Sequence, residues 1–281
     1  MAQSTKHIAL LCPGGPITRD LAADIEHLTR AHCGERVRLH FHDQCFEADG
    51  HFAGSDARRS AAFLETANDP RFEAIWFAKG GYGACRLDSA LFGQLNEHAR
   101  KKTYLGYSDN GVLLGRLYKG KIGHPVHGPI AVDLQRQGGD VAIKRSLDYL
   151  TDRARSSIEP VALQGHSIVA FNINVLAHLV ATDWAPDLSG HTILLEDVGE
   201  YLYRIDRAMF AIMNAKIMQG AAGICLGRIS DVPENDRPFG ESAEQIVKRW
   251  CNEVDVPYFG RADIGHDRDN KVVPFGLTPT T

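Results

Sequence analysis

The first half of this sequence alternates short apolar runs with segments of helical length, a pattern that few folds accommodate. The predicted strands lie at 8–12, 37–41, 74–78 and 103–107. Three of these runs are continuously apolar, as in strands buried on both faces, and 37–41 alternates with a period of two. Amphipathic helices are predicted at 55–68 and 112–118. Strands separated by helices form βαβ units, so we predict a parallel sheet covered on both faces.

A weaker pattern between residues 123 and 165 marks the expected domain boundary. The breakers His127-Gly-Pro129 and Gly138-Gly139 interrupt the chain there, and one helix is predicted at 140–152. We predict an α/β fold, with an N-terminal parallel-sheet α/β domain at 1–138 and a linker and smaller C-terminal α+β domain at 139–281. The C-terminal domain is expected to contain helices at 172–182, 203–219 and 242–252, and strands at 192–196, 222–226 and 257–260.

The composition is that of an ordinary globular protein, with 44% hydrophobic residues and a formal net charge of -4. With this charge, no long-range electrostatic field favours binding to nucleic acid or to an anionic membrane. No run of about 18 apolar residues indicates a membrane-spanning helix, and no signal-peptide cleavage site follows the short apolar run near the start. The six cysteines are scattered without a CxxC pair, which is typical of reduced thiols. We therefore expect a cytoplasmic protein.

The segment Gly106-Tyr-Ser-Asp-Asn110 lies between a predicted strand and a predicted helix. A serine at such a position can present its hydroxyl from a sharp turn, which requires small residues two positions away on either side. Gly106 meets this requirement and Asn110 meets it in part, since Asn tolerates left-handed backbone. Ser108 is therefore a candidate nucleophile. The alternative is that Ser108 or Asp109 only caps the following helix.

The turn Lys79-Gly-Gly-Tyr-Gly83 follows the strand predicted at 74–78. Its glycines allow backbone amides to face a ligand, as an oxyanion hole requires. The two common glycine patterns for phosphate and dinucleotide binding do not fit this turn. An ordinary tight turn is the alternative.

Acidic and histidine side chains of the second half complete the set of candidates. Glu196-Asp-Val-Gly-Glu200 ends a predicted strand, a rigid position from which a carboxylate can orient a histidine. His266 follows a glycine in a loop and is a candidate general base, because an ordinary histidine pKa lies near neutral pH. The alternatives are a solvated acidic loop and one structural histidine among 13. His40 and His42 share one face of a strand, but no further ligand accompanies them, so no metal site is predicted.

In their order along the chain, these segments resemble the LD-carboxypeptidase family of serine peptidases, to which the microcin C immunity peptidases also belong. The segments that carry the resemblance are Gly80-Gly-Tyr-Gly83 before Arg86, Gly106-Tyr-Ser-Asp109, His127-Gly-Pro129, Leu195-Glu-Asp-Val-Gly-Glu200, Tyr203-Arg-Ile-Asp-Arg207 and Ile264-Gly-His266. The resemblance extends from the turn at 13–16 to 274–276, which is nearly the whole chain. The part between 195 and 207 is the most specific.

The resemblance implies a triad of Ser108 as nucleophile, His266 as base and Glu196 as the acid that orients the base, with Glu200 as the other candidate acid. Members of the family have two domains, of which the first carries the serine and the second the glutamate and histidine. They are cytoplasmic homodimers that need no metal or cofactor. They cleave the amide between the L-centre of a diamino acid and a terminal D-alanine in murein tetrapeptides, in cell-wall recycling.

Further site residues are also implied by the resemblance. The oxyanion hole is expected at the backbone amides of Gly81 and Asp109, and the substrate is expected to contact Arg86, Phe171 and Glu200. Phe171 stands where members have a glycine, so its ring is expected to reshape the substrate pocket. The sequence also departs from the family in the Asn-Gly pair after Asp109. Both departures leave the triad in place and concern the choice of substrate.

Three alternatives stay open at this point. The first is a microcin-C-type immunity peptidase that hydrolyses another small amide, which an aromatic slot for a nucleotide would favour. A pocket with basic side chains, for which Arg86, Arg204 and Arg207 are candidates, would instead favour the murein peptide. The second is a generic α/β-hydrolase, which would normally have glycine two residues after the serine. The third is a catalytically inactive ligand-binding relative, which a failure of the triad to converge would favour.

Overall fold

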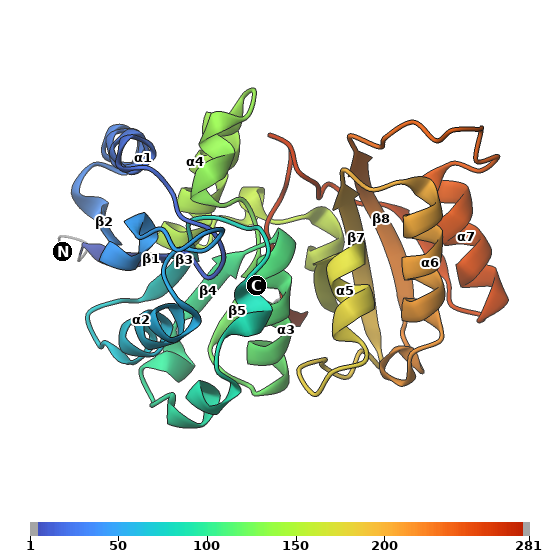
Figure 1. The fold of residues 1–281 in the computed structure, drawn as a ribbon, viewed down its shortest axis with the longest axis horizontal. Coiled ribbons are helices and arrows are strands. Elements are labelled where there is room, and N and C mark those ends of the chain that lie inside the picture. The colour runs from blue at the N-terminus through green and yellow to red at the C-terminus, as the bar shows by residue number, and fades with distance from the viewer. Residues whose placement is uncertain (1–4, 278–281) are drawn as a thin grey trace.

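A computed structural model describes residues 5–277 of the chain. The first half of the chain forms the sheet at the left of Figure 1. Its strands are β1 (Lys6–Leu11), β2 (Val37–Phe41), β3 (Ala74–Phe77), β4 (Thr103–Gly106), β5 (His124–His127) and β10 (Val273–Pro274), in the order β10-β5-β4-β3-β1-β2. β1 to β5 are parallel, and β10 pairs antiparallel with β5. The predicted parallel sheet is confirmed, and β5 is a strand that the pattern did not indicate.

Helices cover both faces of this sheet, as predicted. They are α1 (Arg19–Cys33) and α4 (Gly139–Asp152) on one face, and α2 (Asp56–Asn68) and α3 (Gly111–Lys119) on the other. Ile8 and Trp76 pack toward α1 and α4, whereas their neighbours Ala9 and Ile75 pack toward α2 and α3. Because successive strand residues point to opposite faces, a continuously apolar strand supplies both cores.

A second sheet lies beside the first, at the right of Figure 1. Its strands are β6 (Ser167–Asn172), β7 (His191–Val198), β8 (Gly223–Ser230), β9 (Tyr258–Arg261) and β11 (Gly276–Leu277), in the order β11-β6-β7-β8-β9. One face is covered by α5 (Ile173–Leu179), α6 (Leu202–Met213) and α7 (Ala243–Glu253). β6 to β9 are parallel and β11 is antiparallel to β6. The two-domain α/β fold is confirmed. The second sheet has more parallel strand pairs than the sheet of an α+β domain usually has.

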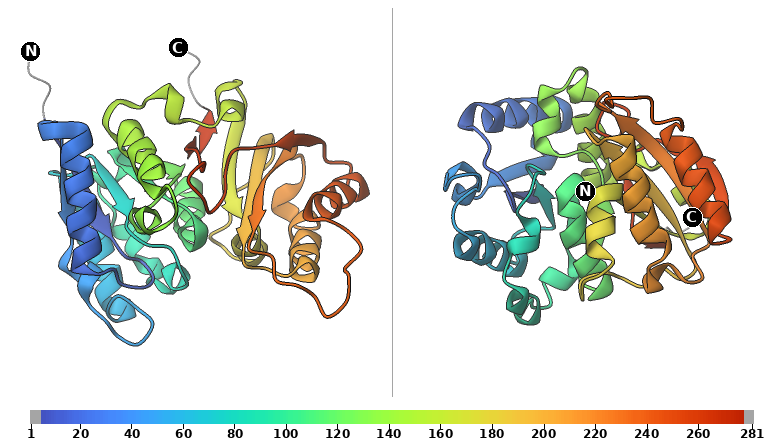
Figure 2. Two further views of the ribbon diagram at one scale, coloured as in Figure 1. Left: turned by 90° about the horizontal axis from the view of Figure 1, so that it is seen from above. Right: turned by 45° about the vertical axis from the view of Figure 1, so that its right-hand side comes forward.

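The two sheets share an apolar core and are connected by the end of the chain. Ile168 and Leu194 of the second sheet belong to the same core as Ile8 and as Ile143 of α4. After β9 the chain returns to the first sheet as β10 and then joins the second as β11, in the red segment that passes between the halves in Figure 2. The helix that was predicted for the linker is α4, and it packs on the first sheet. The boundary near residue 138 stays a prediction.

Two further properties concern membranes and thiols. Across residues 5–277, no helix has both the length and the apolar character needed to cross a bilayer. The six cysteines all lie in this range and are free thiols. Cys85 is exposed and the other five are buried.

Candidate active site

The predicted site residues lie at or beyond the carboxyl ends of parallel strands. Ser108 follows β4, Gly81 follows β3, and Glu196 lies near the end of β7. His266 lies in the loop between β9 and β10. In parallel α/β sheets, ligands bind at these ends of the strands, so both domains can contribute to one site.

Ser108 has the backbone of a sharp turn. Its φ of 59° lies in the left-handed region, which residues other than glycine seldom adopt. Ser108–Asn110 form a short 3-10 turn that leads into α3. Gly80 lies against this turn, because a Cβ atom built on it would be 3.1 Å from Ser108 Cβ and 3.3 Å from Ser108 Oγ. The Asn110 side chain donates a hydrogen bond to the carbonyl of Lys79 at 3.1 Å, which ties the two turns together.

Glu196 and His266 form a buried pair. His266 Nδ1 donates a hydrogen bond to Glu196 Oε2 at 2.7 Å, and their side chains are 5% and 0% exposed. Burial opposes protonation of His266, but the charge of Glu196 and this hydrogen bond outweigh it and raise the pKa of His266. Because Nδ1 carries the hydrogen of this bond, Nε2 of the neutral imidazole has a free lone pair that can accept a proton. Glu200 points elsewhere: its Oε1 accepts a hydrogen bond from Asn174 at 3.1 Å.

The loop that carries His266 is held by Tyr107, which follows β4, and by His127 of β5. The Tyr107 ring lies 4.6 Å from the His266 ring, and its hydroxyl donates to Asp133 at 2.7 Å. Asn270 Oδ1 accepts from the amide of Gly265 at 3.2 Å and from Nε2 of His127 at 3.1 Å. Burial lowers the pKa of His127 to about 4, so this histidine is neutral near pH 7.

These supporting groups were not among the predicted site residues. His127 lies in the His127-Gly-Pro129 segment that contributed to the resemblance, and that segment was the available signal for it. Tyr107 was visible only as the residue before Ser108. Nothing in the local sequence singles out Asn270, because its role depends on contacts with a strand more than a hundred residues away.

Ser108 makes no hydrogen bond to His266 in the described residues, although both of its chain neighbours lie close to that histidine. Tyr107 packs on the imidazole, and Asp109 is near enough for the charge of His266 to act on it. Burial raises the pKa of Asp109, against the lowering effect of that charge. Catalytic hydrogen bonds are often long without substrate. The triad thus stays a prediction, as do the oxyanion roles of Gly81 and Asp109.

Two predicted substrate residues have other neighbours. Arg86 binds Asp56 through Nη2 and Nε at 2.7 and 2.9 Å, and its guanidinium lies over the Phe52 ring. Phe171 is buried in β6, where it packs against Phe275 at 5.3 Å and against Gly111 of α3. Phe171 is therefore packed between β6 and α3 and is not among the lining residues of the cavity described below.

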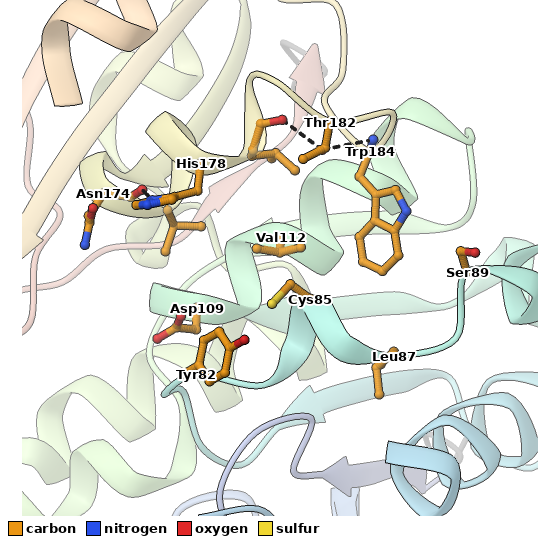
Figure 3. Close-up of a pocket in the computed structure, with 12 residues that line it drawn as sticks. Tyr82, Cys85, Leu87, Ser89, Asp109, Val112, Asn174, His178, Thr182 and Trp184 are labelled. Carbon is orange, nitrogen blue, oxygen red and sulfur yellow. Dashed lines mark hydrogen bonds between the residues drawn. The ribbon is translucent and has the colours of Figure 1, made fainter.

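A cavity of about 630 Å³ lies beside Asp109, between the turn after β3, α3 and α5 (Figure 3). Its lining consists of Tyr82, Cys85, Leu87, Ser89, Asp109, Val112, Asn174, Val175, His178, Leu179, Thr182 and Trp184. Figure 3 shows Asp109 and Tyr82 near one end and Trp184 near the other. This volume is in the range of small-molecule sites. No group of three or more His, Cys, Asp or Glu is placed to hold a metal ion anywhere in residues 5–277.

Comparison with known proteins identifies the fold and the family of this chain. The family model of the LD-carboxypeptidase N-terminal domain matches residues 8–128, and that of the LD-carboxypeptidase C-terminal domain matches residues 165–280. Among solved structures, the muramoyltetrapeptide carboxypeptidase of Oxalobacter formigenes superposes with a TM-score of 0.79 at 21% identity, over 96% of this chain and 93% of that one. The microcin C7 self immunity protein MccF gives 0.76 at 15% identity, over 99% and 98%. At these identities the structures show a shared fold.

Sequence relatives give the family. A putative carboxypeptidase of Synechocystis is 30% identical over 243 residues, which cover 81% of this chain and 75% of the relative. The murein tetrapeptide carboxypeptidase of Pseudomonas aeruginosa is 27% identical over 294 residues, covering 96% of this chain and 91% of the relative. With both domain models matched and these relatives aligned over most of their length, the chain belongs to the LD-carboxypeptidase family and is a serine-type carboxypeptidase.

Proposed function

We propose that this protein releases the terminal D-alanine of murein tetrapeptides by cleaving its amide with the L-centre of a diamino acid. Ser108 is the nucleophile, His266 the general base and Glu196 the acid that orients the base. The observation that carries this proposal is the buried hydrogen bond between His266 Nδ1 and Glu196 Oε2. From the family resemblance we further propose that the protein works in the cytoplasm, as a homodimer, on peptides of cell-wall recycling.

The reaction proceeds through two acyl transfers. Nε2 of neutral His266 takes the hydroxyl proton as Ser108 Oγ attacks the carbonyl carbon, and Glu196 stabilises the imidazolium. The amides of Gly81 and Asp109 donate to the oxyanion. The imidazolium then protonates the amine of D-alanine, the C–N bond breaks, and an ester remains on Ser108. Water that loses its proton to His266 hydrolyses the ester and restores the enzyme.

A second candidate is hydrolysis of another small amide, in the manner of a microcin-C-type immunity peptidase. The cavity beside Asp109 favours it, because Trp184 offers an aromatic face there and no Lys or Arg occurs among the twelve described residues of the lining. MccF has been solved with glutamyl sulfamoyl guanosine, a ligand of that protein. The Glu196–His266 pair argues against a catalytically inactive relative, which would have no need of an oriented base.

The test is release of free D-alanine from a purified murein tetrapeptide, measured with D-amino acid oxidase. Wild type is compared with Ser108→Ala and, as a matched control, with Ser156→Ala, which changes an exposed serine between the domains. We expect release by wild type and the control, and a loss of about 10³-fold or more in Ser108→Ala. Equal release by all three proteins would refute the serine mechanism. Hydrolysis of an aminoacyl nucleotide amide without any release of D-alanine would favour the second candidate.

A further inference from the structure

Among its twelve described lining residues, the cavity beside Asp109 has no Lys or Arg side chain to pair with a negative group of a substrate. The only ionisable carboxylate among these residues is that of Asp109. Trp184 is held in place, because its ring meets Phe92 edge-on at 5.2 Å and its amide donates to Thr182 Oγ1 at 3.2 Å. A terminal D-alanine has only a methyl side chain and is much smaller than about 630 Å³. Negative groups of the remaining substrate therefore require cations outside the cavity.

A groove with two arginines adjoins this cavity. It has a volume of about 460 Å³ and lies between α5 and α6. Arg204 and Arg207, one turn apart on α6, line it together with small alanine side chains. Asn174 and His178 of α5 line both the groove and the cavity, so the two spaces adjoin at these two side chains.

One of the two positive charges of the groove has no acidic partner among the described residues. Arg207 has no carboxylate within ion-pair distance among residues 5–277, and its guanidinium lies 5.5 Å from the centre of the Tyr203 ring. Arg204 has one acidic partner, Glu200, at 3.5 Å. Asp206 lies between them in sequence but accepts hydrogen bonds from Arg249 and Trp250 of α7.

From this arrangement we propose that Arg204 and Arg207 bind a carboxylate on the acyl part of the substrate. This inference rests on the proposed function, in which D-alanine is the leaving group and every other negative group belongs to the acyl part. The diamino acid next to the scissile amide lies in the cavity, and the carboxylate lies across Asn174 and His178 in the groove. Arginine presents paired N–H donors that match a carboxylate, and a phosphate offers similar acceptors.

The kinetic test uses two peptides. One is the murein tetrapeptide, and the other has every carboxylate except that of the terminal D-alanine converted to a carboxamide. We compare kcat/KM for the murein tetrapeptide with kcat/KM for the carboxamide peptide. In Arg204→Gln/Arg207→Gln the ratio of the first value to the second should fall about tenfold, because one charge-assisted contact is lost. In wild type the ratio should also fall with added salt. The control is Arg261→Gln, which removes one exposed positive charge from β9. An unchanged ratio in the double variant would overturn the proposal.

A binding test separates this proposal from the proposed reaction. In Ser108→Ala enzyme, the exposed thiol of Cys85, which lines the cavity, is alkylated with iodoacetamide in the presence of increasing tetrapeptide. The tetrapeptide should slow alkylation, and about tenfold more should be needed after Arg204→Gln/Arg207→Gln. This outcome supports the groove even if wild type releases no D-alanine. Equal protection by the tetrapeptide with and without Arg204→Gln/Arg207→Gln would contradict the proposal. Protection by adenosine monophosphate but not by the tetrapeptide would show that the arginines bind a phosphate and not a carboxylate.

Discussion

Lowering the pH from 7 to 5 should destabilise this protein through one buried histidine, His127. The side chain is 1% exposed at the end of β5, and its Nε2 donates a hydrogen bond to Asn270 Oδ1 at 3.1 Å. A proton on the other ring nitrogen would place a charge in this buried site, which costs free energy. Burial therefore lowers the pKa of His127 from 6.5 to about 4.

The size of the effect follows from these two pKa values. In the unfolded chain the imidazole titrates near 6.5, so between pH 6.5 and 4 the unfolded state binds a proton that the folded state does not. The free energy of unfolding therefore falls as the pH falls through this window. The full difference corresponds to about 3 kcal/mol, of which about 2 kcal/mol is lost between pH 7 and pH 5.

The assay is urea unfolding, followed by tryptophan fluorescence at pH 7, 6 and 5. His127→Gln keeps an amide donor for Asn270 but does not titrate, so it loses packing equally at every pH. We expect wild type to be the more stable at pH 7 and its advantage to shrink by about 2 kcal/mol at pH 5. His166→Gln, which changes an exposed histidine, is the matched control. A constant difference between wild type and His127→Gln across this pH range would refute the reasoning.

Two further predictions concern the reaction. Gly80→Ala places a Cβ atom 3.1 Å from Ser108 Cβ, so it should displace the Ser108 hydroxyl and lower kcat for D-alanine release by about 10- to 100-fold. The control Gly93→Ala, at a position with open space around it, should keep wild-type activity. Equal activities of the two variants would contradict a close approach of Gly80 to the nucleophile. Glu196→Gln removes the charge that raises the pKa of His266, so kcat should fall by about 10³-fold or more, and the acid limb of the kcat/KM profile should move to lower pH. An unchanged midpoint in that pH profile would show that another group is the base.

The strands of the first domain could be predicted where their burial appears in the sequence as a continuous run of apolar residues. The continuously apolar runs at 74–78 and 103–107 correspond to β3 and β4, which are covered on both faces. His124-Pro-Val-His127 gave no such signal, because two of its four residues are histidines, yet it pairs with β4 as β5. The helix expected at 203–219 ends at Met213, and the chain then turns back toward β8.

The local turns and the order of Ser108, Glu196 and His266 along the chain can be read from the amino-acid sequence. Which acidic residue meets the histidine depends on the folded structure. Glu196 lies within β7 and is buried, whereas Glu200 lies beyond the strand and turns toward Asn174. Glu196 and His266 are 70 residues apart, and they meet because the loop after β9 passes the end of β7 before the chain returns to the first sheet. Such a contact depends on how the sheets and loops pack together, which local sequence patterns do not encode.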